Sequence, residues 1–279
     1  MIEVQEIKST TFKIFQPKIK LEMKAGRYLV KTITDTDELF EAFSLRYSVF
    51  QLETIGKSTF DTNNSRELGF DTDSYDLLAD HIVIIDQHSK KIIATCRLNC
   101  SLFTKQFYSE QEFDCSSLIN RSEVKLEVGR VCVHREHRKG IIILLLWRAI
   151  AEYMQNSESK IVFGCGSVMS VNSNEGAILY RYLKEEGKVL SDLNIQPNQK
   201  YRFLELEEKV KEHNGISLTH EERIFAKTLL PPLCKSYFDI GCTIPGLPAI
   251  DQEFNCIDFL TVLESDSLNP HVRQRLFGG

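Results

Sequence analysis

The chain has 279 residues, of which 42% are hydrophobic and 26% are charged, with a formal net charge of −5 at pH 7. This composition is ordinary for a globular protein and too apolar for a disordered one, and the length allows one large domain or two small ones. The acidic balance gives no general attraction for DNA or RNA, so nucleic acid is not an expected partner.

Strand and helix patterns alternate at the start of the chain. Residues 1–17 are expected to form a loose arm. Residues 18–23 and 27–33 alternate apolar and polar side chains around the turn KAGR, which is typical of paired strands. Apolar residues then recur at helical spacing over residues 35–53, which predicts a helix capped by Asp or Thr.

The middle of the chain opens with a polar stretch and continues with regular elements. Residues 54–78 are rich in Asp, Asn, Ser and Gly and are predicted to form a long surface loop, a kind of segment that is often functional. Strands are predicted for DHIVIID, KIIATCRLNC and VKLEVGRVCV, with a short helix between the last two. A helix over 140–155, a buried strand KIVFGCG and a helix over 172–187 follow.

The C-terminal part has fewer signals. Residues 219–241 predict a helix that breaks at two consecutive prolines, and NCIDFLTVLE predicts a strand. The mixture of an antiparallel meander with helices places the fold in the α/β or α+β class, as a mixed sheet flanked by helices. We expect a core over residues 18–187 and a C-terminal extension over 188–279 packed on the same domain, because no linker separates them.

The eight cysteines are scattered among apolar residues without a C-x-x-C pair, so they are predicted to be buried thiols. The first fifteen residues lack the apolar core of a signal peptide, and no run reaches the roughly 18 apolar residues that a membrane-spanning helix needs. These observations favour a cytoplasmic protein in reducing surroundings.

A basic segment meets an apolar helix at HREHRKGIIILLLWRAI, residues 134–150. Unpaired backbone N–H groups at a helix N-terminus attract anions, and the preceding basic residues strengthen that attraction for a phosphate. The alternative is a solvated turn before a helix. The apolar run 141–147 indicates burial on every side, as plain core or against a ligand with a carbon-rich tail. His134 and His137 lack supporting ligands, so no metal is expected.

Several stretches, taken together, resemble the Gcn5-related N-acetyltransferase (GNAT) superfamily. They are SLRYSVFQLE, DHIVIID, IIATCRLN, FYSEQEFDCSSLINRSEVKLEVGRVCVH, HREHRKGIIILLLWRAI, SVNSNEGAILYRYLKEEG, LPPLCKSYFDIGC and FNCIDFL. The chain is most similar to the branch that takes acyl groups from acyl carrier protein, near the bacterial ornithine N-acyltransferases called hemolysin-like. The resemblance covers roughly residues 40–263 and implies a GNAT-like fold.

The phosphate loop departs from the usual superfamily pattern. Members that use coenzyme A usually carry R-x-x-G-x-G or R-x-x-G-x-A, whereas this chain has one glycine followed by two isoleucines. Bulky residues hinder close backbone approach to two phosphates, so the single phosphodiester of a carrier-protein phosphopantetheine arm fits better. No permanent cofactor is expected, and acyl-CoA stays an alternative donor. The predicted phosphopantetheine site is Val131, Val133, Arg138, Lys139, Gly140, Ile141 and Ile142, and the predicted surface for the acidic carrier protein is Arg135, Arg138 and Lys139.

Glu127 lies in the middle of a predicted strand, where a charge is disfavoured without a partner or a function. A carboxylate can take the proton that a protonated amine must lose before it attacks a thioester, and the resemblance implies this role for the E-x-x-R motif. The alternative is a structural pair with Arg130. Strict alternation sends the two to opposite faces, so such pairing needs a β-bulge, like the one that the superfamily keeps at this strand.

Arg46, Arg97 and Asp80 are the remaining predicted acceptor-binding residues, besides Arg130. The resemblance to acyl-homoserine lactone synthases implies a role for both arginines and for Asp80 in the acceptor and acyl pocket. Arg97 would bind a carboxylate and Asp80 an ammonium group of the acceptor. The alternative is a mutual, buried salt-bridge network, and both can hold at once.

The leaving thiolate needs a proton, and the resemblance implies a tyrosine of the motif NEGAILY, Tyr180, as the general acid. The ornithine branch instead shares the position of Tyr182, and both tyrosines can simply pack. The implied activity is transfer of a 3-hydroxy fatty acyl group from acyl carrier protein to ornithine. Alternatives are a signal synthase for an N-acyl amino acid or acyl-homoserine lactone, and a non-catalytic acyl-carrier or lipid-binding protein. A lipid-like product leaves open a peripheral contact with the inner membrane.

Overall fold

A computed structural model of the chain describes residues 15–55, 69–190 and 192–278. Its contacts group into two compact units, each assembled from separate segments. Unit 1 comprises Met1–Lys105, Leu126–Ser159 and Gln274–Gly279, and unit 2 comprises Gln106–Lys125 and Lys160–Arg273. The expected boundary at residue 187 stays a prediction, and most of the expected N-terminal arm lies outside the described residues.

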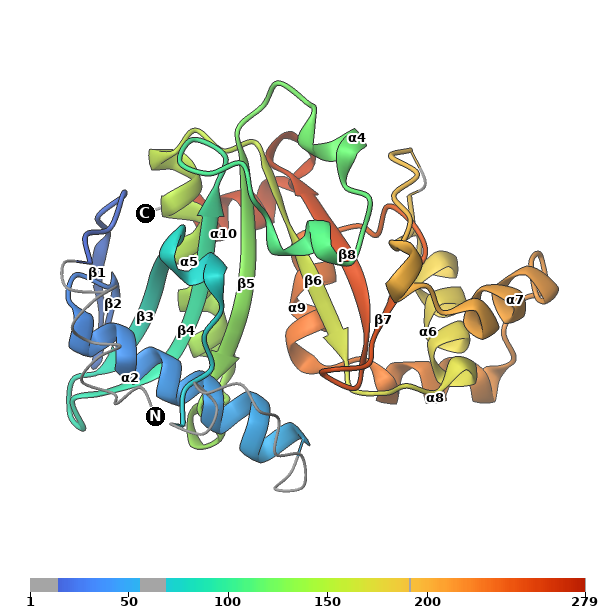
Figure 1. Ribbon diagram of the computed structural model, residues 1–279, viewed down its shortest axis with the longest axis horizontal. Helices are drawn as coiled ribbons and strands as arrows, with labels where there is room; N and C mark the ends of the chain where they lie inside the picture. Colours follow the sequence, from blue (N-terminus) through green and yellow to red (C-terminus); the bar gives the residue numbers. More distant parts are fainter. Residues whose placement is uncertain (1–14, 56–68, 191, 279) are drawn as a thin grey trace. The chain divides into compact units, whose positions relative to one another are not determined.

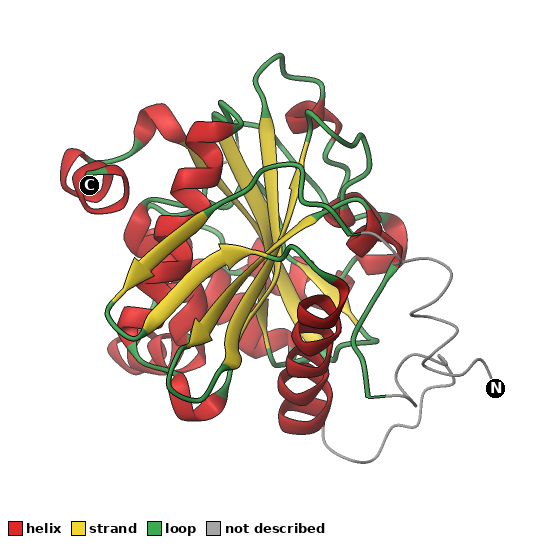
Figure 2. Cartoon of the chain, turned by 90° about the vertical axis from the view of Figure 1, so that its left-hand side faces the viewer, coloured by secondary structure: helices red, strands yellow, loops and turns green. Residues whose placement is uncertain are grey.

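Unit 1 holds a five-stranded antiparallel sheet in the order β1-β2-β3-β4-β5 (Figure 1). Its strands are β1 Glu22–Ala25, β2 Tyr28–Thr32, β3 Asp80–Asp86, β4 Lys91–Cys100 and β5 Lys125–Val133. Figure 2 shows the twist of neighbouring strands against one another, which is usual for such sheets. The predicted meander is confirmed, including the tight turn after β1, where Gly26 has a φ of +59° that suits a residue without Cβ.

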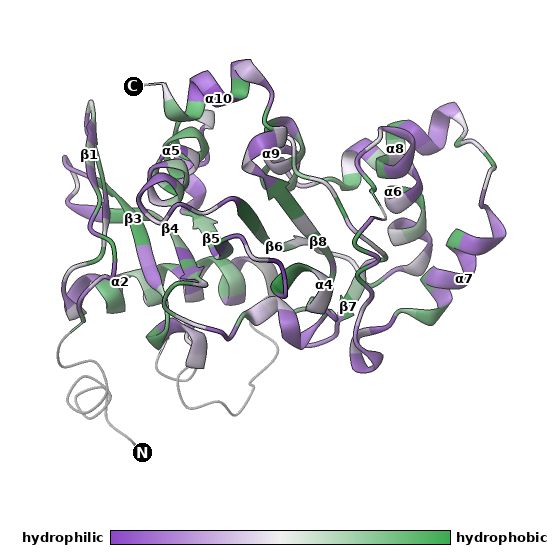
Figure 3. Cartoon of the chain, turned by 90° about the horizontal axis from the view of Figure 1, so that it is seen from above, coloured by the Kyte–Doolittle hydropathy of each residue, from purple (hydrophilic) through white to green (hydrophobic). Residues whose placement is uncertain are grey.

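Two helices of unit 1 cover opposite faces of this sheet (Figure 3). Helix α2, Thr36–Tyr47, continues into the π-helix η1, Ser48–Ile55, and together they form the helix predicted over 35–53. Its Leu39 and Phe43 pack with Val83 of β3. Helix α5, Gly140–Asn156, contacts the sheet through Tyr153, which binds Asp80 of β3. Because Asp80 and Val83 are three residues apart, they project from opposite faces.

Helix α5 is largely buried, but the expected burial on every side of residues 141–147 is not complete. Ile142, Leu145, Leu146 and Trp147 are buried, whereas Ile141 in the first turn is 46% exposed. Among the described residues, no helix has both the length and the apolar character that crossing a bilayer requires. Burying a side chain of this size contributes about 1.5–3 kcal/mol, so α5 is a main source of stability for unit 1.

In unit 2, the strands β6, β8 and β7 are antiparallel neighbours in that order. Its strands are β6 Ile161–Val168, β7 Ala249–Asp251 and β8 Cys256–Glu264, and its longer helices are α6 Ser173–Glu185, α7 Leu204–Glu212, α8 His220–Leu229 and α9 Pro232–Ile240. The break between α8 and α9 falls at Pro231, because proline cannot donate the hydrogen bond that would continue α8. The predicted helix over 172–187 and the predicted strand over 255–264 are confirmed.

Short elements complete the described chain. They are η2 Ser74–Leu77, η3 Tyr108–Gln111, α4 Ser116–Ile119, η4 Arg135–His137, η5 Gln199–Tyr201, η6 Ser265–Ser267 and α10 Pro270–Phe277. Of these, η2 matters most for the site described below, because its Asp76 is buried within the predicted surface loop. All eight cysteines are free, and seven of them are buried, which confirms the expectation of buried thiols.

Candidate active site

A polar surface lies within unit 1, on the face of the sheet that α2 covers. In the strand register, His81 is opposite Arg97, Arg97 is opposite Gly129, and Asn99 is opposite Glu127. Residues directly opposite one another on antiparallel strands project from the same face. The register therefore places Arg97, Glu127, Asn99 and His81 together on a sheet face that would otherwise carry apolar core residues.

The end of α2 and residues 71–76, within the predicted surface loop, supply side chains to this face. Arg46, at the end of α2, is buried and donates from Nε to Asp71 Oδ1 at 2.8 Å and from Nη1 to Asp76 Oδ1 at 2.7 Å. Burial alone raises the pKa of Asp76, but Arg46 and Arg97 outweigh burial and hold this pKa well below its usual range. Asp76 is therefore an anion, and its burial is tolerated because it is paired.

Two further arginines join the same acidic segment. Arg97 Nη1 donates to Asp73 Oδ1 at 2.5 Å and to Asp76 Oδ1 at 3.1 Å, and Arg130 Nη2 donates to Asp73 Oδ2 at 2.9 Å. Arg130 Nε also lies 3.6 Å from Asp71 Oδ1. The alternative of a buried salt-bridge network therefore holds for Arg46 and Arg97, but their partners are the aspartates of residues 71–76 instead of Asp80, and Arg130 joins the network.

The strand β5 carries a bulge at Arg130. Thr95 is opposite Cys132 and Arg97 is opposite Gly129, so three residues of β5 span two of β4. Arg130 has a φ of +50°, in the left-handed region where a residue with Cβ is uncommon. The bulge expected in the E-x-x-R motif is confirmed, and it turns Arg130 toward Asp73 on the face that Glu127 shares.

Glu127 is 3% exposed and lies beside Asn99, which is 1% exposed. Asn99 Nδ2 donates to Glu127 Oε2 at 3.4 Å across the two strands. A carboxylate so deeply buried in a sheet is rare without a partner or a function. The strand pairing thus fixes one carboxylate at the centre of the polar face.

Asp80 lies elsewhere, although the sequence analysis paired it with Arg97. Its Oδ1 accepts from the backbone N–H of Lys18 at 2.8 Å, and its Oδ2 accepts from Ile19 N–H at 3.0 Å and from the Tyr153 hydroxyl at 2.9 Å. Asp80 is opposite Leu98 in the register, so it projects away from the face that carries Arg97. The structure does not bring the two together, because adjacent strand residues alternate between faces.

The predicted donor loop connects β5 to α5. Val131 and Val133 lie at the end of β5, Arg135 begins η4, and Lys139, Gly140, Ile141 and Ile142 lie at the start of α5. Lys139 occupies the N-cap position without a side-chain hydrogen bond to the first turn, and that turn has no acidic residue. Arg138 is held in place, because Nε donates to Val133 O at 3.1 Å and Nη2 to Glu53 at 2.5 Å. Arg135 and Lys139 are exposed.

The two candidate acids are residues of α6 in unit 2. Tyr180 is buried among apolar residues that include Ala177, Leu183 and Phe238, and burial raises the pKa of its hydroxyl. Tyr182 is less buried, and Lys227 Nζ lies 6.0 Å from the centre of its ring. Packing therefore accounts for the position of Tyr180 within unit 2, and its role as an acid stays a prediction.

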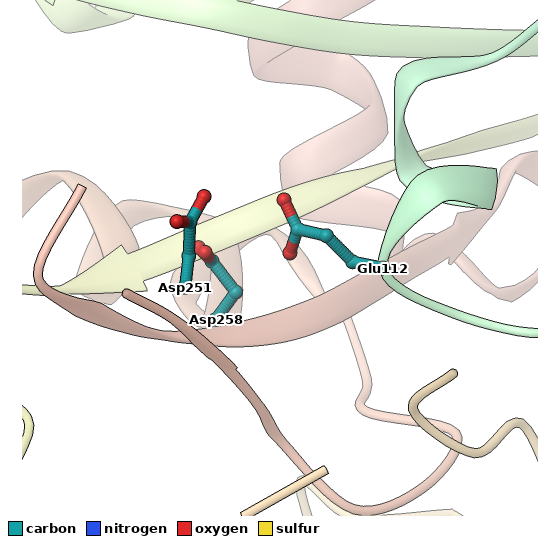
Figure 4. A group of neighbouring side chains, drawn as sticks. All are labelled: Glu112, Asp251 and Asp258. Carbon is teal, nitrogen blue, oxygen red and sulfur yellow. The ribbon is translucent and has the colours of Figure 1, made fainter. Parts of the chain in front are cut away.

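Unit 2 contains a second polar cluster that the sequence analysis did not single out (Figure 4). Oxygen atoms of Glu112, Asp251 and Asp258 lie within 4.8 Å of one another, and all three residues are buried. Burial and the two neighbouring carboxylates raise the pKa of Glu112 to about 9. A proton held by Glu112 thus reduces the negative charge at neutral pH. Three carboxylates at this spacing are also a ligand set for a hard cation.

Local donors satisfy part of this cluster. The Ser167 hydroxyl donates to Asp258 Oδ1 at 2.5 Å, and the Cys256 thiol lies 3.2 Å from Asp258 Oδ2. Asp251 Oδ1 accepts from the backbone N–H groups of Glu253 at 2.7 Å and Phe254 at 3.0 Å. These contacts hold the two aspartates in place and leave their mutual repulsion to be offset by protonation.

Sequence reasoning missed Asn99 and the three aspartates of residues 71–76. A signal for the aspartates was available, because three acids within six residues follow a helix whose buried arginine requires anions. Asn99 gave no local signal, since an asparagine in a strand acquires a function only from what lies opposite.

Comparison with known proteins adds to this geometry. The family described as "Acetyltransferase (GNAT) domain" matches residues 45–148. The chain is 26% identical to the L-ornithine N(alpha)-acyltransferase of Rhodobacter capsulatus over 260 residues, 88% of this chain and 93% of that protein. It is 28% identical to the protein of the same name from Rhizobium meliloti over 239 residues, 81% and 76% of the two chains. The crystal structure of the AHL synthase LasI covers 91% of this chain and 97% of its own, with a TM-score of 0.48 and 13% identity.

Residues 45–148 thus match a GNAT acetyltransferase domain, and the named relatives support an N-acyltransferase. The chain is similar to the L-ornithine N(alpha)-acyltransferases over most of its length. The matched range 45–148 contains Arg46, Arg97, Glu127 and the start of α5. These features of unit 1 therefore lie within the matched domain.

Proposed function

We propose that the protein transfers a 3-hydroxy fatty acyl group from acyl carrier protein to the α-amine of ornithine, giving lyso-ornithine lipid. The observation that carries the proposal is the buried Glu127 beside the β5 bulge, in a chain whose relatives are named L-ornithine N(alpha)-acyltransferases. The names support ornithine as the acceptor. The carrier protein as donor is supported by the form of the phosphate loop.

Glu127 acts as the general base. An α-ammonium group cannot attack a thioester until it loses a proton, and most of it is protonated at neutral pH. Glu127 takes that proton directly or through a water, and the freed nitrogen lone pair attacks the thioester carbonyl carbon. The carbon–sulfur bond then breaks as the attacking nitrogen loses its second proton, and the thiolate leaves with one proton, for which Tyr180 or Tyr182 is the candidate donor. The second nitrogen proton replaces the one that this donor gives up, and Glu127 returns the first proton to water.

The bulge and the start of α5 bind the donor. A bulge leaves backbone groups at Arg130 and Val131 outside the regular ladder, where they can donate to the thioester carbonyl oxygen as negative charge develops on it. The backbone N–H groups of Gly140 and Ile141 at the start of α5 are the candidates to bind the single phosphodiester of a phosphopantetheine arm, because the N–H of Ile142 donates to Lys139 O at 2.9 Å. Exposed Arg135 and Lys139 add attraction for an acidic carrier protein.

The charge of the polar face suits the proposed acceptor. Arg46, Arg97 and Arg130 balance the three aspartates of residues 71–76, and His81 is neutral because burial is the main cause that lowers its pKa to about 4. Glu127 therefore adds one net negative charge, and ornithine carries one net positive charge at neutral pH. We infer that Arg97, which also donates to Asp73 and Asp76, orients the ornithine carboxylate. Asp80, on the other face, has no part in this proposal.

The direct test is product formation. Purified protein is incubated with 3-hydroxyacyl carrier protein, or with the matching acyl-CoA, and a panel of amino acids, and products are identified by mass spectrometry. We expect an N-acyl amide of ornithine and faster turnover with the carrier protein. Consumption of S-adenosylmethionine with release of methylthioadenosine would instead indicate a signal synthase, and no amide with any acceptor would contradict the proposal. Co-sedimentation with anionic vesicles tests the expected peripheral contact with a membrane.

A further inference from the structure

The amide of Asn99 is only partly satisfied at the centre of the polar face. Its Nδ2 donates to Glu127 Oε2 at 3.4 Å, while its Oδ1 is buried and has no hydrogen-bond partner among the described residues. The whole residue is 1% exposed. Leaving a buried carbonyl oxygen unpaired costs about 1–3 kcal/mol, so native proteins rarely keep one without a reason.

Rotating the amide does not remove the problem. If Oδ1 and Nδ2 exchanged places, the carbonyl oxygen would face the Glu127 carboxylate, and two acceptors would repel each other across the strands. The orientation with Nδ2 toward Glu127 is therefore favoured, and it turns Oδ1 to the position that needs a donor.

We propose that Asn99 Oδ1 accepts a hydrogen bond from the amine of the acyl acceptor and so holds that amine beside Glu127. Asn99 is then a substrate-binding residue that selects a primary amine. The inference rests on the proposed function only in requiring an amine acceptor, and it adds the group that recognises the reacting nitrogen.

The geometry explains why an amine is preferred to an alcohol. Glu127 Oε and Asn99 Oδ1 are two acceptors on directly opposite residues, whose Cβ atoms are about 4.5–5.5 Å apart in such pairs. An ammonium group can donate to both at once, and after one proton passes to Glu127 the neutral amine still has hydrogens for Asn99. A hydroxyl has one hydrogen, so it satisfies one acceptor and leaves the other unpaired.

The neighbouring pair on the same face fits an α-amino acid. Arg97 lies two residues from Asn99 on β4, opposite Gly129. A Cβ at Gly129 would lie 3.9 Å from Nε and Nη2 of Arg97, so the glycine adds no side chain of its own beside the guanidinium. A cation for the carboxylate and two acceptors for the amine thus stand about 7 Å apart along the strand.

The test is a comparison of kinetic constants for Asn99→Leu and Asn99→Ser with those of the wild type. We expect the KM for the amine acceptor to rise about 10- to 100-fold in both, which corresponds to losing one hydrogen bond to a charged group. The KM for the acyl donor should stay within twofold. The serine variant is less demanding for folding, and thermal melting of each variant reports whether the fold is kept.

A matched control is Thr95→Val on the same face of β4. Thr95 Oγ1 donates to Ile82 O at 2.9 Å, so its substitution removes a buried hydroxyl of similar size from the same strand without touching Asn99. We expect the KM of Thr95→Val for the acceptor to stay within about twofold of the wild-type value.

A second measurement tests whether Asn99 recognises the α-amine of the acceptor. The inhibitor 2-hydroxy-5-aminopentanoate carries a hydroxyl in place of the α-amine of ornithine. Wild-type protein should bind it at least tenfold more weakly than ornithine, and Asn99→Leu should reduce this preference. Equal loss of both ligands, or an unchanged acceptor KM in a folded variant, overturns the inference. Failure of the wild type to acylate ornithine overturns only the proposed acceptor, and the Asn99 comparison is then made with the amine that is acylated.

Discussion

Arg46 and Asp76 form a buried two-pronged ion pair, with Nη1–Oδ1 at 2.7 Å and Nη2–Oδ2 at 3.1 Å. The pair ties the end of helix α2 to η2, two segments 30 residues apart in sequence. Because Asp76 also accepts a hydrogen bond from Arg97 of β4, its carboxylate connects helix α2, η2 and the sheet of unit 1.

Asp76→Asn should therefore destabilise the protein strongly. Removing one member of a buried ion pair leaves two buried arginines undercompensated, and such changes cost about 3–5 kcal/mol. Urea denaturation followed by circular dichroism measures the free energy of unfolding. Asp37→Asn, on the first turn of α2, is the control for replacing an aspartate by an asparagine. A decrease in the free energy of unfolding below about 1 kcal/mol for Asp76→Asn would contradict the structural role of the network.

Glu127→Gln should reduce turnover about 10²- to 10⁴-fold, the range for acid–base catalysis, because an amide cannot take the proton of the acceptor amine. The KM for the acyl donor should change little. Glu22→Gln, an exposed residue of β1, removes the same charge and should be neutral. Residual activity that recovers at high pH, where the amine is already neutral, would support the base; full activity at neutral pH would refute it.

Charge reversal at the start of α5 should act on the donor. Lys139→Glu places an acid at the N-cap region proposed to face the carrier protein and its phosphodiester, so the KM for acyl carrier protein should rise severalfold, most at low salt. Lys24→Glu on β1 makes the same charge change at another exposed position of unit 1. An equal effect of both variants would show that only net charge matters.

Glu112 should make stability fall with rising pH. Its pKa is raised by burial and by Asp258 and Asp251 from 4.5 to about 9, so the folded protein keeps a proton that the unfolded chain releases. Its stabilising contribution is complete below pH 4.5 and is lost as the pH rises toward 9, by at most about 1.4 kcal/mol per pH unit. Glu112→Gln, which does not titrate, should flatten the pH dependence of the free energy of unfolding between pH 5.5 and 8.5.

Glu208→Gln, an exposed residue of α7, is the control for this experiment and should leave the slope unchanged. Parallel pH profiles for wild type and Glu112→Gln would contradict the protonated carboxyl. If added Ca²⁺ raises the melting temperature of the wild type at pH 8 and not that of Glu112→Gln, a cation instead of a proton offsets the charge of the cluster.

Much of the architecture follows from periodicity. The 2-residue and 3.6-residue repeats of apolar side chains predict the meander β1–β5, helices α2 and α6 and the burial of α5, because burial of one face is a local property of the pattern. The bulge at Arg130 was expected from the family resemblance, since alternation in E-x-x-R sends Glu127 and Arg130 to opposite faces and the superfamily keeps a bulge at this strand.

The partners of the site residues were decided by tertiary structure. The aspartates that bind Arg46 and Arg97 come from a stretch without periodicity, so their nearness to Arg46 in the chain makes them candidate partners but does not say which side chains meet. The face on which Asp80 lies depends on strand register, and the cluster of Glu112 with Asp251 and Asp258 joins residues more than a hundred positions apart. The sequence alone determined which segments are buried, because the apolar side chains of an element all contribute to its burial. The tertiary structure determined which polar groups meet, because hydrogen bonds and ion pairs require distances of a few ångströms that strand register and the path of the chain set.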